Sequence, residues 1–146
     1  MENIFLDTNV VMDFLLGRND RASVQKVFQY VAEGKCKAFI SVGSFYTITY
    51  LVEYALKKNH IDKNERIDRL RVILHNLLST VYIAFHTSSS LLNGVDDLRF
   101  RDLEDSYQHQ AAVAAGCSCI ITSNIKDFSD VDDVNVVLPK DFSVAM

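Results

Sequence analysis

Acidic residues stand at three places where predicted strands end or a predicted helix begins. Residues 4–6 are apolar and end in Asp7, and the apolar segment 117–122 is followed by Asp127. The third group begins a helical segment and comprises Asp102, Glu104 and Asp105. Acids that are held together repel one another and stay ionised only when a cation compensates them. Their oxygens favour Mg²⁺ or Mn²⁺, which can polarise a phosphoryl group and activate water.

Helix capping is a simpler explanation for several of these acids. Asp7 or Asn9 would cap the helix that follows the first strand. Asp102 would cap the later helix, and the helix dipole favours Asp105 in its first turn. The ordered set of acids at element ends favours a metal site for Asp7 and Asp105. Capping by Asn9 and Asp102 remains compatible with that site.

The elements that position these acids alternate along the chain. Strand patterns cover residues 3–7, 37–41, 80–85, 117–122 and 134–138. Helical patterns cover residues 10–16, 20–33, 43–58, 62–78 and 102–116. The fourth helix also shows a capping-box pattern, from Asp62 to Glu65.

Alternation of this kind predicts an α/β fold with three layers, α/β/α, around a mostly parallel sheet of about five strands. The length of 146 residues predicts a single domain over residues 1–146. In such sheets, functional groups gather beyond the carboxyl ends of the strands, where Asp7 and residues 122–128 lie.

The composition of the chain indicates its cellular compartment and the state of its cysteines. No segment approaches the roughly 20 apolar residues that span a bilayer, and no signal-peptide pattern follows Met1, so we expect a cytoplasmic protein without membrane contact. Three cysteines without a framework spacing predict reduced, buried and inert thiols and no zinc site: Cys36, Cys117 and Cys119.

The net charge of −4 argues against a general nucleic-acid coat protein. A local basic patch can still bind phosphates, and the candidates are Arg66, Arg69 and Arg71. A solvated helix face is the alternative interpretation of these arginines. His109 follows Asp105 by four residues on the same helix face, where we expect a surface or half-buried histidine rather than a ligand.

Two segments resemble the PIN-domain nucleases, a family that includes the VapC-type toxins of bacterial toxin–antitoxin pairs. The first is FLDTNVVMDFL, residues 5–15, and the second is DLEDSYQHQAAVAAGCSCIITSNIKDF, residues 102–128. Together they frame nearly the whole chain, and they are specific as a pair and weak singly.

The resemblance implies a set of site residues. Asp7, Asp105 and Asp127 would be catalytic metal ligands, with Asn124 as the alternative to Asp127. Supporting positions would be held by Thr8, Asn9 and Thr122.

One position departs from the family pattern. In many members a glutamate stands six residues after a serine such as Ser41, and here that position holds Thr47. Glu53 points elsewhere on the helix, because six residues make about 600° of rotation. Thr47 can hold a metal-bound water without adding charge, and Glu104 is a candidate to supply the missing carboxylate.

The resemblance implies a ribonuclease that hydrolyses single-stranded RNA with Mg²⁺ or Mn²⁺. It also implies an antitoxin protein and a homodimer. The alternative, motivated by Thr47, is a PIN-fold protein with weak or no catalysis that binds RNA or a protein. A haloacid-dehalogenase-like phosphatase ranks low, because that chemistry needs a second acid where this chain has Asn9.

Overall fold

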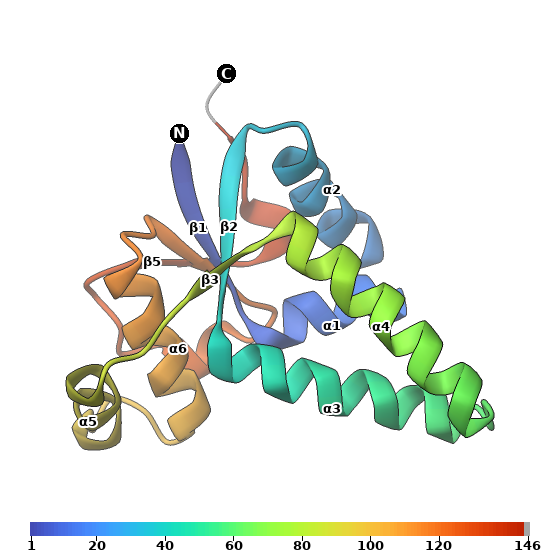
Figure 1. Ribbon diagram of the computed structural model, residues 1–146. Helices are drawn as coiled ribbons and strands as arrows, with labels where there is room; N and C mark the ends of the chain where they lie inside the picture. The colour runs from blue at the N-terminus through green and yellow to red at the C-terminus, as the bar shows by residue number, and fades with distance from the viewer. Residues whose placement is uncertain (145–146) are drawn as a thin grey trace.

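A computed structural model describes residues 1–144, and its centre is one parallel sheet (Figure 1). The strand order is β3-β2-β1-β4-β5, and every neighbouring pair is parallel. The strands are β1 (Glu2–Leu6), β2 (Cys36–Ser41), β3 (Tyr82–Ala84), β4 (Cys119–Ile121) and β5 (Asn135–Val137). The predicted five-stranded parallel sheet is confirmed, although β3 and β4 are shorter than the sequence pattern indicated.

Helices connect the strands in the order expected. They are α1 (Thr8–Leu16), α2 (Arg21–Ala32), α3 (Val42–Lys58), α4 (Lys63–Thr80), α5 (Ser88–Asp96) and α6 (Leu103–Ala114). Two short 3₁₀ helices follow, η1 (Ile125–Phe128) and η2 (Pro139–Asp141). The sequence patterns predicted every α-helix of this set except α5.

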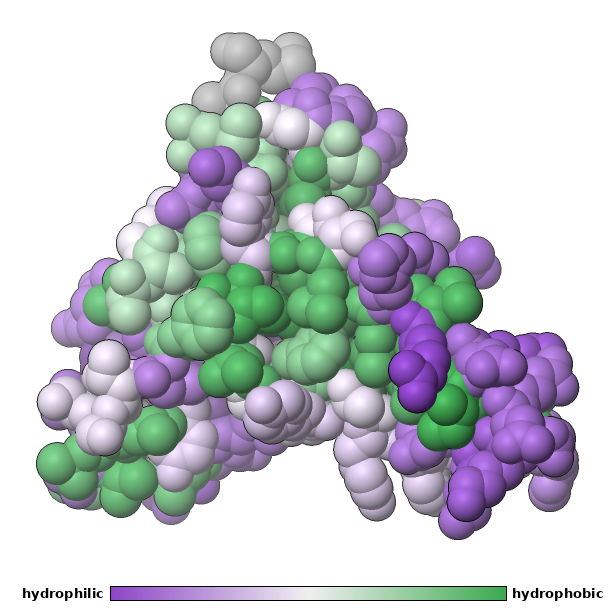
Figure 2. Space-filling model, in the orientation of Figure 1, coloured by the Kyte–Doolittle hydropathy of each residue, from purple (hydrophilic) through white to green (hydrophobic). Residues whose placement is uncertain are grey.

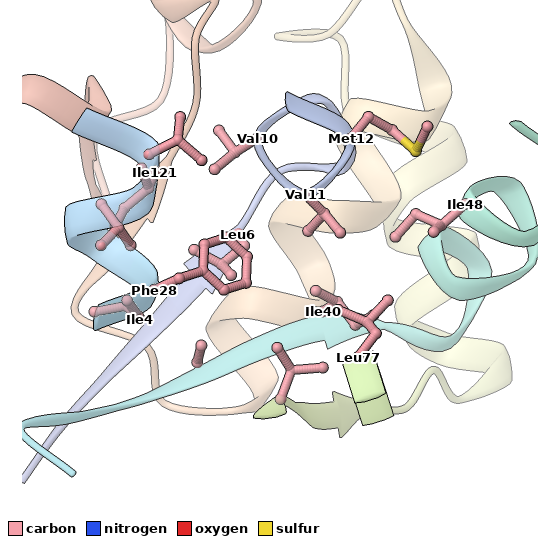
Figure 3. Packing of buried hydrophobic residues seen from close by; sticks show 14 of the residues in the cluster. Ile4, Leu6, Val10, Val11, Met12, Phe28, Ile40, Ile48, Leu77 and Ile121 are labelled. Carbon is pink, nitrogen blue, oxygen red and sulfur yellow. The ribbon is translucent and has the colours of Figure 1, made fainter. Parts of the chain in front are cut away.

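The central strand shows why the molecule has three layers. Ile4 and Leu6 pack with residues of α1 to α4 on one face of the sheet, as Figure 3 shows. Phe5 points to the opposite face and packs with Ala111 and Ala112 of α6. Successive residues of a strand point to opposite faces, and helices cover both faces of this sheet, so Ile4, Phe5 and Leu6 are all fully buried. The α/β/α arrangement is therefore confirmed.

The predicted helix caps are only partly present. Asp102 caps α6, since its side chain accepts a hydrogen bond from the Glu104 amide at 2.9 Å. Asn9 lies inside α1, so the prediction that it caps this helix was wrong. Asp62 makes no capping hydrogen bond, and the predicted capping box of α4 was wrong as well. Glu65 pairs with Arg69 one turn later instead.

Helices α3 and α4 form an arm that extends to one side of the sheet (Figure 1). The 17 residues of α3 give the arm a length of about 25 Å, at 1.5 Å per residue. Hydrophilic side chains cover the free end of the arm in Figure 2. The beginning of α3 stays at the carboxyl edge of the sheet, next to the end of β1.

The thiols are free and buried, as predicted. Burial raises the pKa of Cys117 and that of Cys119 to about 12, so both thiols stay protonated and unreactive. Within residues 1–144, no helix combines the length and apolar character needed to cross a membrane.

Candidate metal centre

Asp7 lies at the carboxyl end of the central strand, next to the end of β4. Its amide donates to the carbonyl of Ile121 at 3.0 Å, which fixes the two strand ends side by side. Its carboxylate is almost fully buried and accepts two hydrogen bonds, from the Thr122 hydroxyl at 2.7 Å and from the Gln108 amide at 3.0 Å. Burial raises the pKa of Asp7, and these two hydrogen bonds oppose that rise.

Gln108 of α6 joins Asp7 to Asp105. Its Nε2 lies 3.0 Å from Oδ1 of Asp7 and 3.4 Å from Oδ1 of Asp105. The sum of these two distances is the largest separation that the two carboxylate oxygens can have. Two cations about 4 Å apart can span such a separation, and one cation can bridge the two oxygens where they lie within about 4–5 Å of each other.

The orientation of this amide is fixed from its other end. Oε1 of Gln108 accepts from the Thr8 amide at 3.0 Å, and the hydroxyls of Thr8 and Ser44 each lie 3.3 Å away. Because a backbone N–H can only donate, the atom that faces it must be the oxygen, and Nε2 must face the acids. Helices α1, α3 and α6 thus meet at one buried side chain.

Neither Gln108 nor Ser44 was among the residues predicted from the sequence. Gln108 follows Asp105 by three residues, so the two share a helix face. Ser44 follows Ser41 by three and donates its amide to the Ser41 hydroxyl, which caps α3. These spacings were the available signals, but polar residues in helices usually face solvent.

Asp105 is a buried acid in an unfavourable environment. Burial raises its pKa to about 8, and the negative charge of Asp7 adds to the effect, followed by smaller contributions from other acids. Its Oδ2 is buried and has no hydrogen-bond partner among residues 1–144. A buried oxygen without a hydrogen-bond partner is typical of a carboxylate that binds a cation.

Glu104 lies between Asp105 and the start of α1. Its Oε1 is 3.2 Å from the hydroxyl of Thr8, which is also 2.8 Å from that of Ser44. Burial raises the pKa of Glu104, and the hydrogen bond from Thr8 opposes the rise. The acid therefore borders the same polar network as Asp7.

Asp127 and Asn124 lie in the segment after β4. The amide nitrogen of the Asn124 side chain donates to Asp127 at 2.8 Å, and the Asn124 backbone donates to the Thr122 hydroxyl at 3.0 Å. Asp127 is exposed, and its charge contributes to the raised pKa of Asp105. Asp105 and Asp127 line one pocket of about 260 Å³.

A third buried acid, Asp13 of α1, has partners of its own. Its carboxylate accepts from Arg18 at 2.9 Å, from Asn19 at 2.7 Å and from Ser123 at 3.2 Å. The contact with Ser123 attaches the segment after β4 to α1. This acid is fully compensated and stabilises the surroundings of the pocket.

Other predicted residues lie around the centre or away from it. Thr47 is half-buried on α3, one turn after Ser44. Asn9 is exposed in the first turn of α1. The arginines predicted to bind RNA belong to the half of α4 near the free end of the arm: Arg66, Arg69 and Arg71.

The expectation that His109 is a surface or half-buried residue was wrong. The ring is 1% exposed, and its Nε2 lies 2.7 Å from a carboxylate oxygen of Asp133. Phe100 packs against it with ring centroids 5.4 Å apart. His109 therefore connects α6 to the segment before β5.

The oxygen atoms around Asp7 and Asp105 partly meet the requirements of a hard cation. In the part of the chain that the structure describes, no three His, Cys, Asp or Glu side chains are arranged as a metal-binding group. Asp7 and Asp105 nevertheless offer carboxylate oxygens beside one another, one of them buried without a partner. Oxygen donors of this type fit Mg²⁺ or Mn²⁺. Reorientation of Asp127, which now faces Asn124, would supply a third.

Comparisons with known proteins show the family to which the fold belongs. A family model described as PIN domain matches residues 3–126. The curated protein Ribonuclease VapC1 of Aquifex aeolicus (strain VF5) is 27% identical over 146 residues, which cover 97% of this chain and 93% of the relative.

Solved structures share the fold at lower identity. DNA-bound VapBC from Salmonella typhimurium has a TM-score of 0.68 at 14% identity and covers 93% of this chain and 97% of that one. VapBC2 from Rickettsia felis, bound to a DNA fragment from its promoter, has a TM-score of 0.62 at 18% identity and covers 92% of this chain and 96% of that one. A toxin–antitoxin complex from Klebsiella pneumoniae has a TM-score of 0.57 at 22% identity and covers 93% of this chain and 97% of that one.

Proposed function

The chain belongs to the PIN domain family, and from this membership we propose that it is a metal-dependent ribonuclease that hydrolyses single-stranded RNA. In this proposal residues 1–146 form one PIN-like domain that acts as the toxin of a toxin–antitoxin pair in the cytoplasm. The observation that carries the proposal is the pair of carboxylates, Asp7 and Asp105, held by one amide, with a buried oxygen of Asp105 left unpartnered.

Asp7 and Asp105 would hold Mg²⁺ or Mn²⁺, and Asp127, Asn124 or Glu104 would complete the ligand set. When bound, the cation would polarise the phosphoryl group and lower the pKa of the attacking water. With the pKa of Asp105 at about 8, this carboxyl keeps a proton at neutral pH when no cation is bound. Cation binding would then displace that proton.

The remaining residues of the centre position the ligands. Thr122 holds one oxygen of Asp7 and Gln108 holds the other, so the carboxylate cannot rotate. Thr8 and Ser44 fix the amide of Gln108, which keeps its Nε2 directed at both Asp7 and Asp105. A centre that is oriented before substrate arrives needs little reorganisation during the reaction.

The proposed partners are RNA, an antitoxin protein and a second copy of the chain. The structural neighbours are VapBC or toxin–antitoxin complexes, which supports a protein partner. Exposed apolar side chains on and just after α5 offer a surface for such a partner. They are Leu91, Leu92, Val95 and Leu98.

The test of the nuclease proposal is cleavage of a single-stranded RNA in Mn²⁺, in Mg²⁺ and in EDTA. The chain should cleave only with a divalent cation. Asp7→Asn should reduce the rate at least about a hundredfold, the scale on which loss of one electrostatic group acts. Asp62→Asn, an exposed N-cap acid on the arm, is the matched control and should cleave normally. Equal activity of the Asp7→Asn variant and wild type would reject the proposal.

Thr47 supports the second candidate, a PIN-fold protein with weak or no catalysis. Helix α3 brings hydroxyls rather than a carboxylate toward the centre, and affinity for hard cations rises with ligand charge. Thr47→Glu should therefore tighten Mg²⁺ binding in calorimetry and raise cleavage at limiting Mg²⁺. Tighter binding without any cleavage would favour the second candidate, whereas no change in either would show that Thr47 does not face the cation.

A further inference from the structure

The pocket beside the candidate metal centre carries cations as well as acids. Asp105 lies in its wall, and Asp102 and Asp127 line it from α6 and from η1. Arg101 immediately precedes Asp102, and Lys126 immediately precedes Asp127, so each side of the pocket contributes one cation next to one acid.

These two cations differ from the third one in the pocket. Arg99 is held by Asp97, to which its guanidinium donates at 2.8 Å and 3.0 Å, and by Asp132. Arg101 and Lys126 are exposed and form no ion pair within residues 1–144. They are therefore not committed to neutralising the acids beside them, and their charges are available to an anion.

We propose that Arg101 and Lys126 bind backbone phosphates of the RNA in the pocket beside the candidate metal centre, as positioning residues for the strand. This inference rests on the proposed nuclease function. A pocket lined by several carboxylates repels a phosphodiester, so the strand needs cationic contacts near the acids to approach them. An arginine and a lysine supply contacts of this kind without reading the base sequence.

The arm is a weaker candidate for the same role. Arg69 is paired with Glu65 at 2.7 Å, and Arg66 donates to the carbonyl of Ile61 at 3.2 Å. Both lie in the half of α4 near the free end of an arm about 25 Å long, whose other end reaches the centre. The strand would have to span that length to contact both regions.

The experiment compares two variants that each lose two positive charges. Arg101→Ala/Lys126→Ala removes the pocket cations, and Arg69→Ala/Arg71→Ala removes exposed cations of the arm. Cleavage of a labelled single-stranded RNA with Mn²⁺ gives kcat and KM at several salt concentrations, and affinity is measured in EDTA. The pocket variant should raise KM about tenfold with kcat nearly unchanged. The slope of log affinity against log salt concentration should decrease in magnitude by roughly one for each cation removed.

Controls separate the two proposals. Arg101→Lys/Lys126→Arg keeps both charges and should retain a KM close to that of wild type. If wild type cleaves RNA and the pocket variant has an unchanged KM, the phosphate contacts are wrong and the nuclease proposal stands. If wild type does not cleave, the affinity in EDTA decides: equal binding by the pocket variant and wild type rejects the phosphate contacts. Absence of any RNA binding or cleavage by wild type rejects both proposals.

Discussion

A single buried amide, that of Gln108, connects the two carboxylates on which the candidate centre depends. It donates to Asp7 and to Asp105 and accepts from the amide of Thr8. Each of these partners is buried, so none can replace a lost hydrogen bond with bulk water. The geometry of the centre and the stability of the fold therefore both depend on the side chain of Gln108.

Gln108→Met tests that connection, because methionine has a similar size and no amide. Loss of the hydrogen bonds leaves the Asp7 carboxylate and the Thr8 amide underpartnered, which should lower the free energy of unfolding by about 1–3 kcal/mol. Thermal unfolding measures the effect as a fall in Tm of roughly 3–10 °C. Gln110→Met, two residues later on the same helix and only half-buried, is the control and should change Tm little.

The acid beside Gln108 makes stability depend on pH. The folded-state pKa of Asp105, about 8, lies above the ordinary value of an aspartate, so the folded protein holds this proton more tightly than the unfolded chain does. The stabilisation is complete below about pH 4, the unfolded pKa, and is lost as the pH rises to about 8. In EDTA, the contribution of Asp105 should therefore fall over this range.

Urea unfolding at pH 5 and pH 8 in EDTA measures this dependence. Asp105→Asn carries no titrating proton, and its stability should fall less than that of wild type between the two pH values. It should also be at least as stable as wild type at pH 8, because the like-charge repulsion is gone. Parallel pH profiles for the two proteins would contradict the raised pKa.

At the scale of elements, the contact between α5 and α6 determines where the acid-bearing helix lies. Ser106 donates its hydroxyl to the carbonyl of Gly94 at 2.7 Å, and both residues are buried. A Cβ added at Gly94 would lie 2.8 Å from Cδ1 of Tyr107, too close for the two helices to keep their separation. The first turn of α6, which carries Asp105, is thus seated against α5.

Gly94→Ala should separate these helices at a cost of about 1–3 kcal/mol in unfolding free energy, as overpacking does. Gly43→Ala is a matched control in the first turn of α3, where the nearest atom to an added Cβ is Oγ of Ser41 at 3.9 Å. That variant should gain roughly 0.5–1 kcal/mol, because alanine is the better helix former. Urea unfolding of both variants should therefore show changes of opposite sign.

The same elements show how far sequence reasoning reaches. Apolar runs predicted the five strands, including β1 and β4 in the centre of the sheet, where Ile4 to Leu6 and Cys119 to Ile121 are buried. Helix α5 was not predicted because its sequence, SSSLLNGVD, is rich in residues typical of loops. Its start is nevertheless capped reciprocally by Thr87 and Ser90, a box in which serine takes the place of glutamate.

Some residues of the candidate site could likewise be predicted from the sequence, and others could not. The acids at element ends were predicted, because parallel strands present their carboxyl ends at one edge. The helix position of Gln108 was not informative, because only packing against α1 and α3 buries it. The pairing of His109 with Asp133 depends on the path of the chain before β5, which no local pattern specifies.

At the scale of the whole molecule, the two acids exist as a pair only in the folded state. Asp7 directly follows the first strand and Asp105 lies in α6, so β1 and α6 must both be in place before their carboxylates meet. A cation that needs both acids binds the folded protein and not the unfolded chain. Binding should then stabilise the fold.

Mn²⁺ at a hundred times its Kd should add about 2.7 kcal/mol to the free energy of unfolding. For a chain of this length, that corresponds to a rise in Tm of roughly 5–10 °C. Differential scanning fluorimetry over a Mn²⁺ series measures the shift. Asp105→Asn should show a much smaller one, and an equal shift in both proteins would place the bound cation elsewhere.

The central place of β1 has a consequence for synthesis on the ribosome. One neighbour of β1, β2, is made soon after it, whereas Ile4 pairs with Cys119 on the other side. At about 5–20 residues per second, β1 waits roughly 6–20 seconds for that second neighbour. Throughout this interval the nascent chain lacks the strand end that holds Asp7 in place. If the chain acts as the ribonuclease proposed above, it would become able to cut the message that encodes it only after β4 has left the ribosome.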